Sequence, residues 1–174
     1  LVYSDNDAHW AQETQILTIL RSDDQGLTWA KHAVVDQADL RKGEERLVTP
    51  RLSALPDGRL AVIVDHDDFG HFHEDQACGN WIYWSEDGGL IWSGPHDYGI
   101  GGFEPDRITV LPEGSLAVVS HTMRRDSQEF CVILTVSEDN GRTWTQRAEV
   151  AHDGYHRFCE GALVLLEGGV LACL

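Results

Sequence analysis

The sequence predicts an all-β protein built from four-stranded antiparallel sheets arranged as the blades of a β-propeller. Two repeated turn patterns lead to this prediction. An octapeptide with the pattern Ser-x-Asp-x-Gly-x-Thr/Ile-Trp begins at Ser22, Ser85 and Ser137. Self-similarity at a regular spacing is the mark of a repeat architecture. The second pattern, a Gly-containing turn between two apolar runs, occurs at residues 55–60, 111–116 and 166–171.

Each octapeptide has the residues of a tight turn between two strands. Asp and Asn side chains hydrogen-bond to their own backbone, and Gly adopts the positive φ that such turns require. We expect the closing Trp to fold back as an apolar plug in the core. The second turn recurs at intervals of about 55 residues, which suits a propeller blade. Two hairpins in each repeat supply the four strands.

We expect a single propeller region over residues 1–174, with about three blades' worth of strands. Residues 30–46 are mostly polar and charged, so a link is expected there. The first and last pieces of the chain would together complete one blade. In chain order, the expected outer strands, two full blades and inner strands lie at residues 1–29, 47–92, 103–144 and 158–174.

Three blades do not close a ring, because propellers typically have about four to eight. The chain is therefore expected to be either a piece of a longer polypeptide or one half of a six-bladed ring formed by two chains. Strand edges without a neighbour attract further strands. Self-association is expected on both interpretations, as a homodimer on the second.

The composition excludes several classes of partner. The 174 residues carry 29 acidic and 13 basic side chains, so nucleic acid and anionic membranes are poor partners for a chain of net charge −16. No apolar run approaches the roughly 18 residues of a membrane span. Without a Cys-x-x-Cys pair we expect no zinc site, and we expect no cofactor. The disulfide state and the cellular compartment stay open for the four scattered cysteines, Cys78, Cys131, Cys159 and Cys173.

The octapeptide resembles the Asp box, or BNR repeat, of the sialidase (neuraminidase) superfamily and related six-bladed propellers. The resemblance covers nearly the whole chain and implies a sialidase-like β-propeller, of which this chain is a part or a half. In that family the boxes lie at the periphery, away from the active site. The Ser and Asp residues of the boxes are therefore expected to be structural, namely Ser22, Asp24, Ser85, Asp87, Ser137 and Asp139.

The same resemblance implies exo-acting glycoside hydrolysis of an acidic sugar such as sialic acid. Sialidases bind the sugar carboxylate with three Arg residues, and they use an Asp acid/base and a Tyr nucleophile assisted by a Glu. The resemblance places the acid/base among Asp5, Asp7 and Glu13, of which Asp7 is expected, unless these acids form a solvated loop. It assigns the assisting Glu to Glu160, in Phe-Cys-Glu-Gly-Ala, with a structural carboxylate as the alternative. Thr49, Glu104 and Glu160 stand at the level of the first triad Arg in successive repeats, and none is Arg. The triad and the Tyr would then lie outside this chain.

Further substrate-binding candidates come from the residues themselves. Glu104, Asp106 and Arg107 place two carboxylates and a guanidinium near the start of an inner strand. An Arg in a pocket can bind a sugar carboxylate through two hydrogen bonds. Arg51 and Arg124 are weaker candidates for the same task. Alternatively, Asp106 and Arg107 are strand neighbours whose side chains point apart.

Asp65 opens the densest ionisable cluster, residues 65–75, which we expect to be a polar loop on the substrate side. Its oxygen and imidazole groups lack the spacing of a calcium or transition-metal site, so no metal is predicted. Two functions compete. One is a sialidase-like glycosidase acting on a sialoside-like glycan, which the context of Glu160 supports. The other is a non-catalytic propeller module that binds glycan or protein, which the missing Arg triad supports.

Overall fold

The structure is a computed structural model, and it describes residues 1–7, 13–67, 79–124 and 129–174. These ranges hold thirteen strands and two short 3₁₀ turns, and every pairing between strands is antiparallel. The predicted all-β architecture of antiparallel sheets is confirmed. Within the same ranges, no helix has the length and apolar character needed to cross a membrane.

The strands form three sheets and a final pair, each in chain order from one edge to the other. The first sheet holds β1 (Val2–Asn6), β2 (Thr14–Arg21) and β3 (Ala30–Asp39), followed by the turn η1 (Leu40–Lys42). The second sheet holds β4 (Arg46–Ala54), β5 (Leu60–Asp67), β6 (Gly79–Ser85) and β7 (Ser93–Gly101). The third sheet holds β8 (Thr109–Val110), β9 (Leu116–Met123), β10 (Phe130–Ser137) and β11 (Thr145–Ala151). The pair consists of β12 (Leu163–Leu165) and β13 (Leu171–Cys173), with η2 (Glu167–Gly169) between them.

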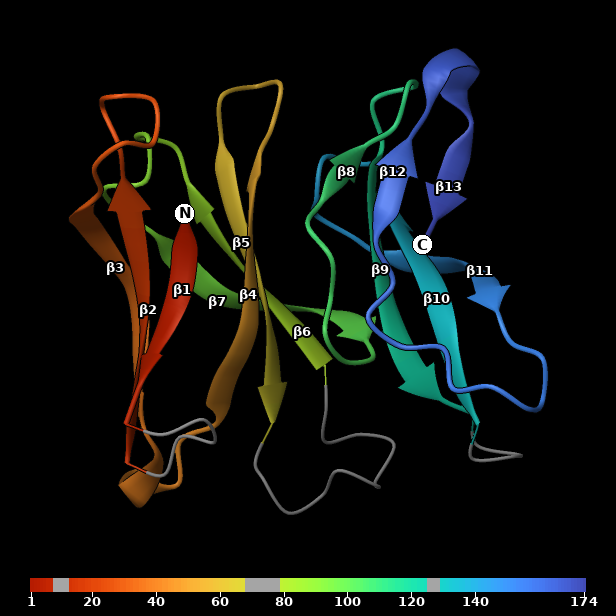
Figure 1. Cartoon of the computed structure of the whole chain (residues 1–174), viewed down its shortest axis with the longest axis horizontal. Helices are drawn as coiled ribbons and strands as arrows, with labels where there is room; N and C mark the ends of the chain where they lie inside the picture. The colour runs from red at the N-terminus through yellow and green to blue at the C-terminus, as the bar shows by residue number, and fades with distance from the viewer. Residues whose placement is uncertain (8–12, 68–78, 125–128) are drawn as a thin grey trace.

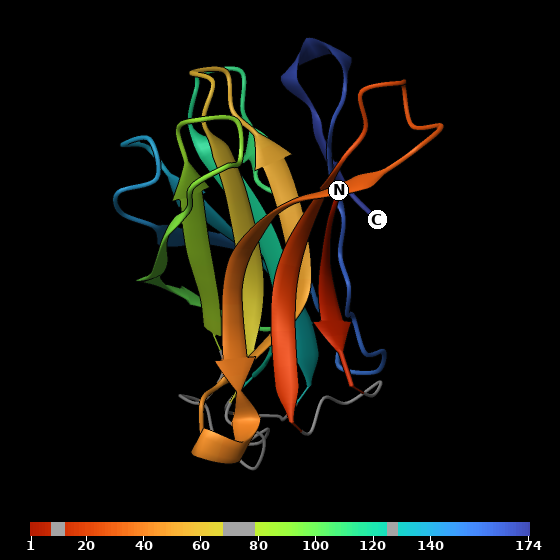
Figure 2. The ribbon, with the colours of Figure 1, turned by 90° about the vertical axis from the view of Figure 1, so that its left-hand side faces the viewer.

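The sheets stand side by side as blades, and the chain runs back and forth within one sheet before it passes to the next (Figure 1). Turned by 90°, the molecule shows both termini at one side, with β1 nearer to them than β3 (Figure 2). The first strand of each blade therefore lies on the side where a propeller has its axis. The last strands, β3, β7 and β11, lie at the periphery.

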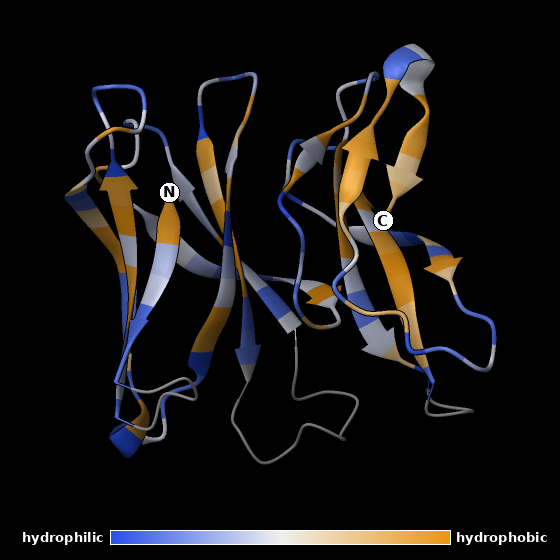
Figure 3. Cartoon of the chain, in the orientation of Figure 1, coloured by the Kyte–Doolittle hydropathy of each residue, from blue (hydrophilic) through white to orange (hydrophobic). Residues whose placement is uncertain are grey.

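Hydrophobic cores fill the spaces between neighbouring sheets. Figure 3 shows the hydrophobic residues concentrated in the strands. In β5, Val62 and Val64 pack with Leu17 of the first sheet, whereas Ile63 packs with Val118 of the third. Successive side chains of a strand point to opposite faces, so β5 is buried on both. This explains why β5 has an uninterrupted apolar run instead of an alternating pattern.

The octapeptide turns connect the third and fourth strands of the blades, and their polar side chains bind their own backbone. In the last turn, Ser137 Oγ donates to Asp139 (2.9 Å) and accepts from the N–H of Gly141 (2.8 Å). Asp139 accepts the N–H and O–H of Thr143 (2.8 and 2.7 Å), and the indole N–H of Trp144 donates to Gly141 O (3.2 Å). The other two turns repeat the Ser, Gly and Trp bonds. These contacts are the structural role expected for the boxes.

The three Trp residues of these turns differ in burial. Trp144 is buried in the core between the second and third sheets, and Trp92 packs, partly buried, between the first and second. Each packs towards the preceding sheet. Trp29 belongs to the first sheet, which has no preceding sheet among the described residues, and its side chain is 50% exposed. The expectation that all three are core residues is therefore wrong for Trp29.

The structure corrects one further element. Residues 30–39, expected to belong to a polar link, form β3 and pair with β2 across two register shifts. The outermost strands β3, β7 and β11 bury at most one residue each, so they lack the apolar alternation by which strands are recognised. The first sheet thus has three strands and the final pair has two, one more in total than a four-stranded blade holds.

Candidate functional site

Three residues with left-handed backbone recur in successive repeats: Thr49 at the register shift within β4, Glu104 ahead of β8, and Glu160 ahead of β12. Thr49, Glu104 and Glu160 have φ values of 46°, 46° and 53°. They precede the turn glycines Gly58, Gly114 and Gly168 by 9, 10 and 8 residues, so the sequence places them at nearly the same level. A side chain other than Gly in this region costs on the order of 1–3 kcal/mol, and such residues cluster at functional sites. The conformation recurs in three repeats, so we treat this level as the candidate site.

A side chain from the preceding blade holds each of the two Glu residues in place. Asp65 Oδ2 accepts a hydrogen bond from the backbone N–H of Glu104 (3.1 Å), and His121 Nδ1 accepts one from the N–H of Glu160 (3.3 Å). Both acceptors are buried, with exposures of 5% and 6%. Each stands seven residues after the turn glycine of its repeat, which is Gly58 for Asp65 and Gly114 for His121. The second and third blades thus each position the Glu of the following repeat.

His121 contacts both Glu residues, Glu104 through its carboxylate and Glu160 through its backbone N–H. Its Nδ1 is 3.9 Å from Glu104 Oε2, and the rings of Phe103 and Phe130 flank it at centroid distances of 5.6 and 5.7 Å. Burial lowers the pKa of His121, although the charge of Glu160 opposes the shift. A neutral imidazole that accepts at Nδ1 carries its proton on Nε2. The approach to Glu104 is therefore a polar contact and not an ion pair at neutral pH.

Glu104 is the carboxyl group that the site perturbs. Burial raises its pKa, and the negative charge of Glu160 raises it further, whereas Arg51 lowers it. Arg51 itself is exposed on β4. The structure therefore brings four of the predicted site residues to this level of the fold, namely Arg51, Asp65, Glu104 and Glu160.

The neighbouring pair Asp106 and Arg107 does not join this cluster as a unit. Asp106 Oδ2 accepts a hydrogen bond from the N–H of Leu163 (2.8 Å), so it links the third blade to β12. Arg107 is exposed and has no hydrogen bond or ion pair with the part of the chain that the structure describes. Their side chains serve different surroundings, as expected for strand neighbours.

The remaining predicted residues lie elsewhere. Asp7 follows β1, is exposed, and accepts a hydrogen bond from the N–H of Glu13 at Oδ1 (3.3 Å). Arg124 pairs with Glu149 at 3.1 Å near the end of β9. Residues 68–75 of the ionisable cluster lie outside the described ranges, as does Cys78.

Sequence reasoning missed His121 and the two Phe rings around it. A signal for His121 was available, because it stands at the same distance from its turn glycine as Asp65 does. In the described part of the chain, Cys131, Cys159 and Cys173 are free thiols. No group of three or more His, Cys, Asp or Glu residues in that part could hold a metal ion.

Known proteins share both the repeats and the fold. The model of the BNR repeat-like domain matches residues 1–171. A protein of unknown function from Dyadobacter fermentans DSM 18053 superposes with a TM-score of 0.73 at 19% identity, over 97% of this chain and 53% of that one. For the alpha-L-arabinanase of Penicillium chrysogenum complexed with arabinobiose, the TM-score is 0.53 at 27% identity, over 71% and 39%. For the Hadza microbial sialidase Hz136, it is 0.66 at 18% identity, over 91% and 35%.

Among curated proteins, none matches this sequence. The chain spans about half the length of the Dyadobacter structure and less than half of the other two. At these identities the superpositions support the fold alone, and they agree with the blades described above.

Proposed function

This chain belongs to the BNR repeat-like domain family, and from that membership we propose that it is part of a propeller glycoside hydrolase. The proposal rests on one observation. Glu104 and Glu160 meet at His121, whose Nδ1 is 3.9 Å from Glu104 Oε2 and accepts the backbone N–H of Glu160 at 3.3 Å. The charge of Glu160 accordingly raises the pKa of Glu104. A pair of carboxyl groups on either side of the scissile bond is the usual machinery of glycosidases. The arabinanase and the sialidase among the structural neighbours support the same class.

The two carboxyl groups take different roles in this proposal. A raised pKa keeps a carboxyl protonated closer to neutral pH, so Glu104 is the general acid that protonates the leaving oxygen. Glu160 is the second carboxylate, which acts as base or nucleophile. The resemblance to sialidases distributes the roles differently, with Asp7 as acid/base and Glu160 activating a Tyr from elsewhere. Comparing Asp7→Asn with Glu104→Gln decides between the two schemes.

The sugar is the finer part of the proposal. Two neighbouring carboxyl groups repel an anionic sugar, so the site favours a neutral one such as arabinose. Arg51 favours the second candidate, an acidic sugar such as sialic acid, because its charge acts at Glu104 and its guanidinium could bind a carboxylate. If the Arg51→Ala variant loses sialoside hydrolysis while its arabinoside hydrolysis is unchanged, the acidic sugar is the substrate.

The test is an assay of the intact source protein with a fluorogenic sialoside and with arabino-oligosaccharides. Glu104→Gln and Glu160→Gln are each expected to lower kcat by about 100-fold or more. Glu138→Gln is the matched control, since its carboxylate pairs with Arg147 in an exposed turn. Undiminished hydrolysis in both site variants overturns the proposal. Sugar binding without any turnover supports the alternative, a non-catalytic module that binds glycan. The isolated 174-residue chain is expected to show little turnover.

We further propose that the two end blades are covered, by another copy of the chain or by further blades. Trp29 and Leu27 of the first sheet are 50% and 85% exposed, and Val170 and Leu174 at the other end are 57% and 85% exposed. Apolar residues beside unpaired strand edges favour association. Light scattering tests this, with a homodimer near twice 19.4 kDa as the outcome expected for a two-chain ring.

A further inference from the structure

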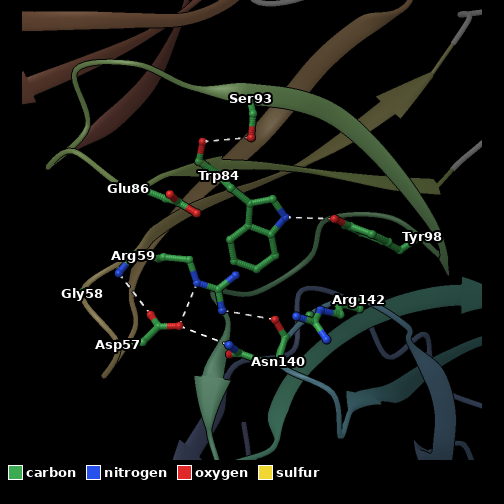
Figure 4. A pocket seen from close by; sticks show the side chains of 10 residues that line it. Asp57, Gly58, Arg59, Trp84, Glu86, Ser93, Tyr98, Asn140 and Arg142 are labelled. Atoms are coloured by element: carbon green, nitrogen blue, oxygen red, sulfur yellow. Dashed lines mark hydrogen bonds and ion pairs between the residues drawn. The ribbon is translucent and has the colours of Figure 1, made fainter.

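A pocket of about 620 Å³ lies at the opposite end of the blades from Glu104 and Glu160. It opens between the second and third blades, where the turn after β4 meets the octapeptide turn of the third blade (Figure 4). Asp65, which accepts the N–H of Glu104, pairs with Val48 towards the start of β4, whereas the pocket lies at the turn after β4. The pocket and the candidate site are therefore at opposite ends of this hairpin.

Hydrogen bonds across the two blades hold the side chains that line the pocket. Asp57 accepts from Arg59 Nε (2.8 Å) and from Asn140 Nδ2 (3.2 Å), while Arg59 Nη2 donates to Asn140 O (3.1 Å). The guanidinium of Arg59 also lies 4.7 Å from the centre of the Trp84 ring. The indole N–H of Trp84 donates to Tyr98 OH (3.1 Å). These contacts fix the pocket before any ligand arrives, which lowers the entropic cost of binding.

Two charged side chains at the pocket are left for a ligand. Glu86 and Arg142 line it, both are exposed, and neither side chain has a hydrogen bond or ion pair with the described residues. Figure 4 shows them on two sides of the Arg59 guanidinium, free of dashed lines. The hydroxyl of Tyr98 still has its own proton to donate. The pocket therefore offers both donors and acceptors.

The charges of the pocket cancel. Asp57 and Glu86 carry two negative charges, and Arg59 and Arg142 carry two positive ones. A phosphate or another anion would meet the two carboxylates, and a cation would meet the two guanidinium groups. An uncharged ligand with several hydroxyl groups matches the site, because adjacent hydroxyls can accept from a guanidinium and donate to a carboxylate.

We propose that this pocket binds a neutral saccharide chain as a second, non-catalytic site. Arg142 and Glu86 bind its hydroxyl groups from two sides, and Tyr98 donates to a third. The saccharide site is independent of the hydrolytic role proposed above, because neither Glu104 nor Glu160 lines this pocket. A protein without hydrolytic activity would still bind at this pocket.

The test follows the indole N–H signal of Trp84 by NMR in the intact source protein. Tyr98→Phe identifies that signal, because it removes the hydrogen-bond acceptor of the indole. Linear arabinohexaose and maltohexaose are the probes, and inorganic phosphate is the anionic comparison. We expect at least one hexasaccharide to shift the Trp84 signal in a saturable way. We expect Arg142→Ala and Glu86→Gln each to weaken that binding by about tenfold, the effect of losing one or two hydrogen bonds.

Arg147→Ala is the matched control, since this Arg lies on the same blade and pairs with Glu138 outside the pocket. Its affinity should equal that of the wild type, as should the hydrolysis of a short substrate in all three variants. A Trp84 signal that neither hexasaccharide moves, or that phosphate alone moves, overturns the proposal. Equal affinities in wild type, Arg142→Ala and Glu86→Gln overturn it as well.

Discussion

The backbone N–H of Glu160 donates a hydrogen bond to Nδ1 of His121 across the boundary between the third blade and the final strand pair. The distance is 3.3 Å, and it joins a left-handed residue to a buried side chain. The equivalent bond one blade earlier joins Glu104 to Asp65. Two different acceptors thus serve one geometry, and His121 is a positioning residue for Glu160.

Replacing His121 by Phe keeps a ring of similar shape and removes the acceptor. The orphaned N–H of Glu160 is expected to relax out of its left-handed turn, so kcat should fall by about tenfold, which corresponds to roughly 1.4 kcal/mol. KM should change less, because no binding group is lost. His121→Asn, which can offer an amide oxygen, should recover part of kcat. Steady-state kinetics of the source protein decide this, with His96→Phe, a partly exposed His on β7, as control. Equal kcat in all variants contradicts the positioning role.

Glu104→Gln is expected to stabilise the fold while it removes activity. Burial and Glu160 raise the pKa of Glu104 in the folded protein. A group with a raised folded pKa gives most stability when protonated, and that stability is lost as the pH rises through the folded pKa. At pH 7 the ionised group therefore weakens the fold, and Gln removes this effect.

The measurement is the Tm of wild type and Glu104→Gln between pH 4 and pH 8. The variant should melt a few degrees higher at pH 7, and the two curves should converge as the pH falls below about 4.5, the ordinary value for Glu. A variant that is less stable than wild type at pH 7 would show that the surroundings of Glu104 do not disfavour its ionised form.

We expect the octapeptide turns to make the fold less stable in acid. Hydrogen bonds from Thr143 and Ser137 lower the pKa of Asp139 from 3.8 to about 2. A lowered pKa adds stability that is present above pH 3.8 and is lost as the pH falls towards 2. Asp139→Ala should therefore lower Tm at neutral pH and flatten its decline in acid. Asp24→Ala should cost less, because Trp29 in its turn is half exposed whereas Trp144 is buried. Equal losses in the two variants would contradict this ranking.

Ser53 should be a strong point of contact between two blades. Its Oγ accepts a hydrogen bond from the buried backbone N–H of Ile108 (2.8 Å). Ser53→Ala leaves that N–H without its partner, so the free energy of unfolding should fall by about 1–3 kcal/mol. Ser93→Ala, in a partly exposed and longer contact of 3.4 Å, is the control and should cost less. Urea denaturation of both variants gives the comparison.

The exposed box Trp of the first blade gives a test of association. If the first sheet is covered by another blade, Trp29 lies in that contact, and Trp29→Asn should shift the mass measured by light scattering towards the monomer. Trp29 is 50% exposed in this chain, so the substitution creates no cavity in the described core. A wild-type chain that is monomeric at every concentration contradicts self-association.

Local patterns were enough to predict the blades, because each turn carries its own hydrogen-bonding residues within eight positions. The same patterns missed β3, where solvent exposure leaves no apolar alternation to detect. They also brought Thr49, Glu104 and Glu160 to nearly the same level, although the distance to the turn glycine varies from 8 to 10 residues, and the shared positive φ agrees with this alignment.

Contacts between blades could not be predicted in the same way. Asp106 was a candidate for the substrate, but its carboxylate accepts from the N–H of Leu163, 57 positions further along the chain. His121 acquires its role from Glu160 and the burial of both faces of β9. Such pairings depend on how blades are stacked, and no residue pattern within one repeat encodes them.

The left-handed position shared by Thr49, Glu104 and Glu160 has a consequence for how such a protein can change. The conformation is inherited with the repeat, and it holds a Thr in one blade and a Glu in the next two. New chemistry at this level needs a new side chain and no new backbone. Thr49 is therefore a position where substitution of one residue could add a third acid, a base or a ligand-binding group without a change of backbone.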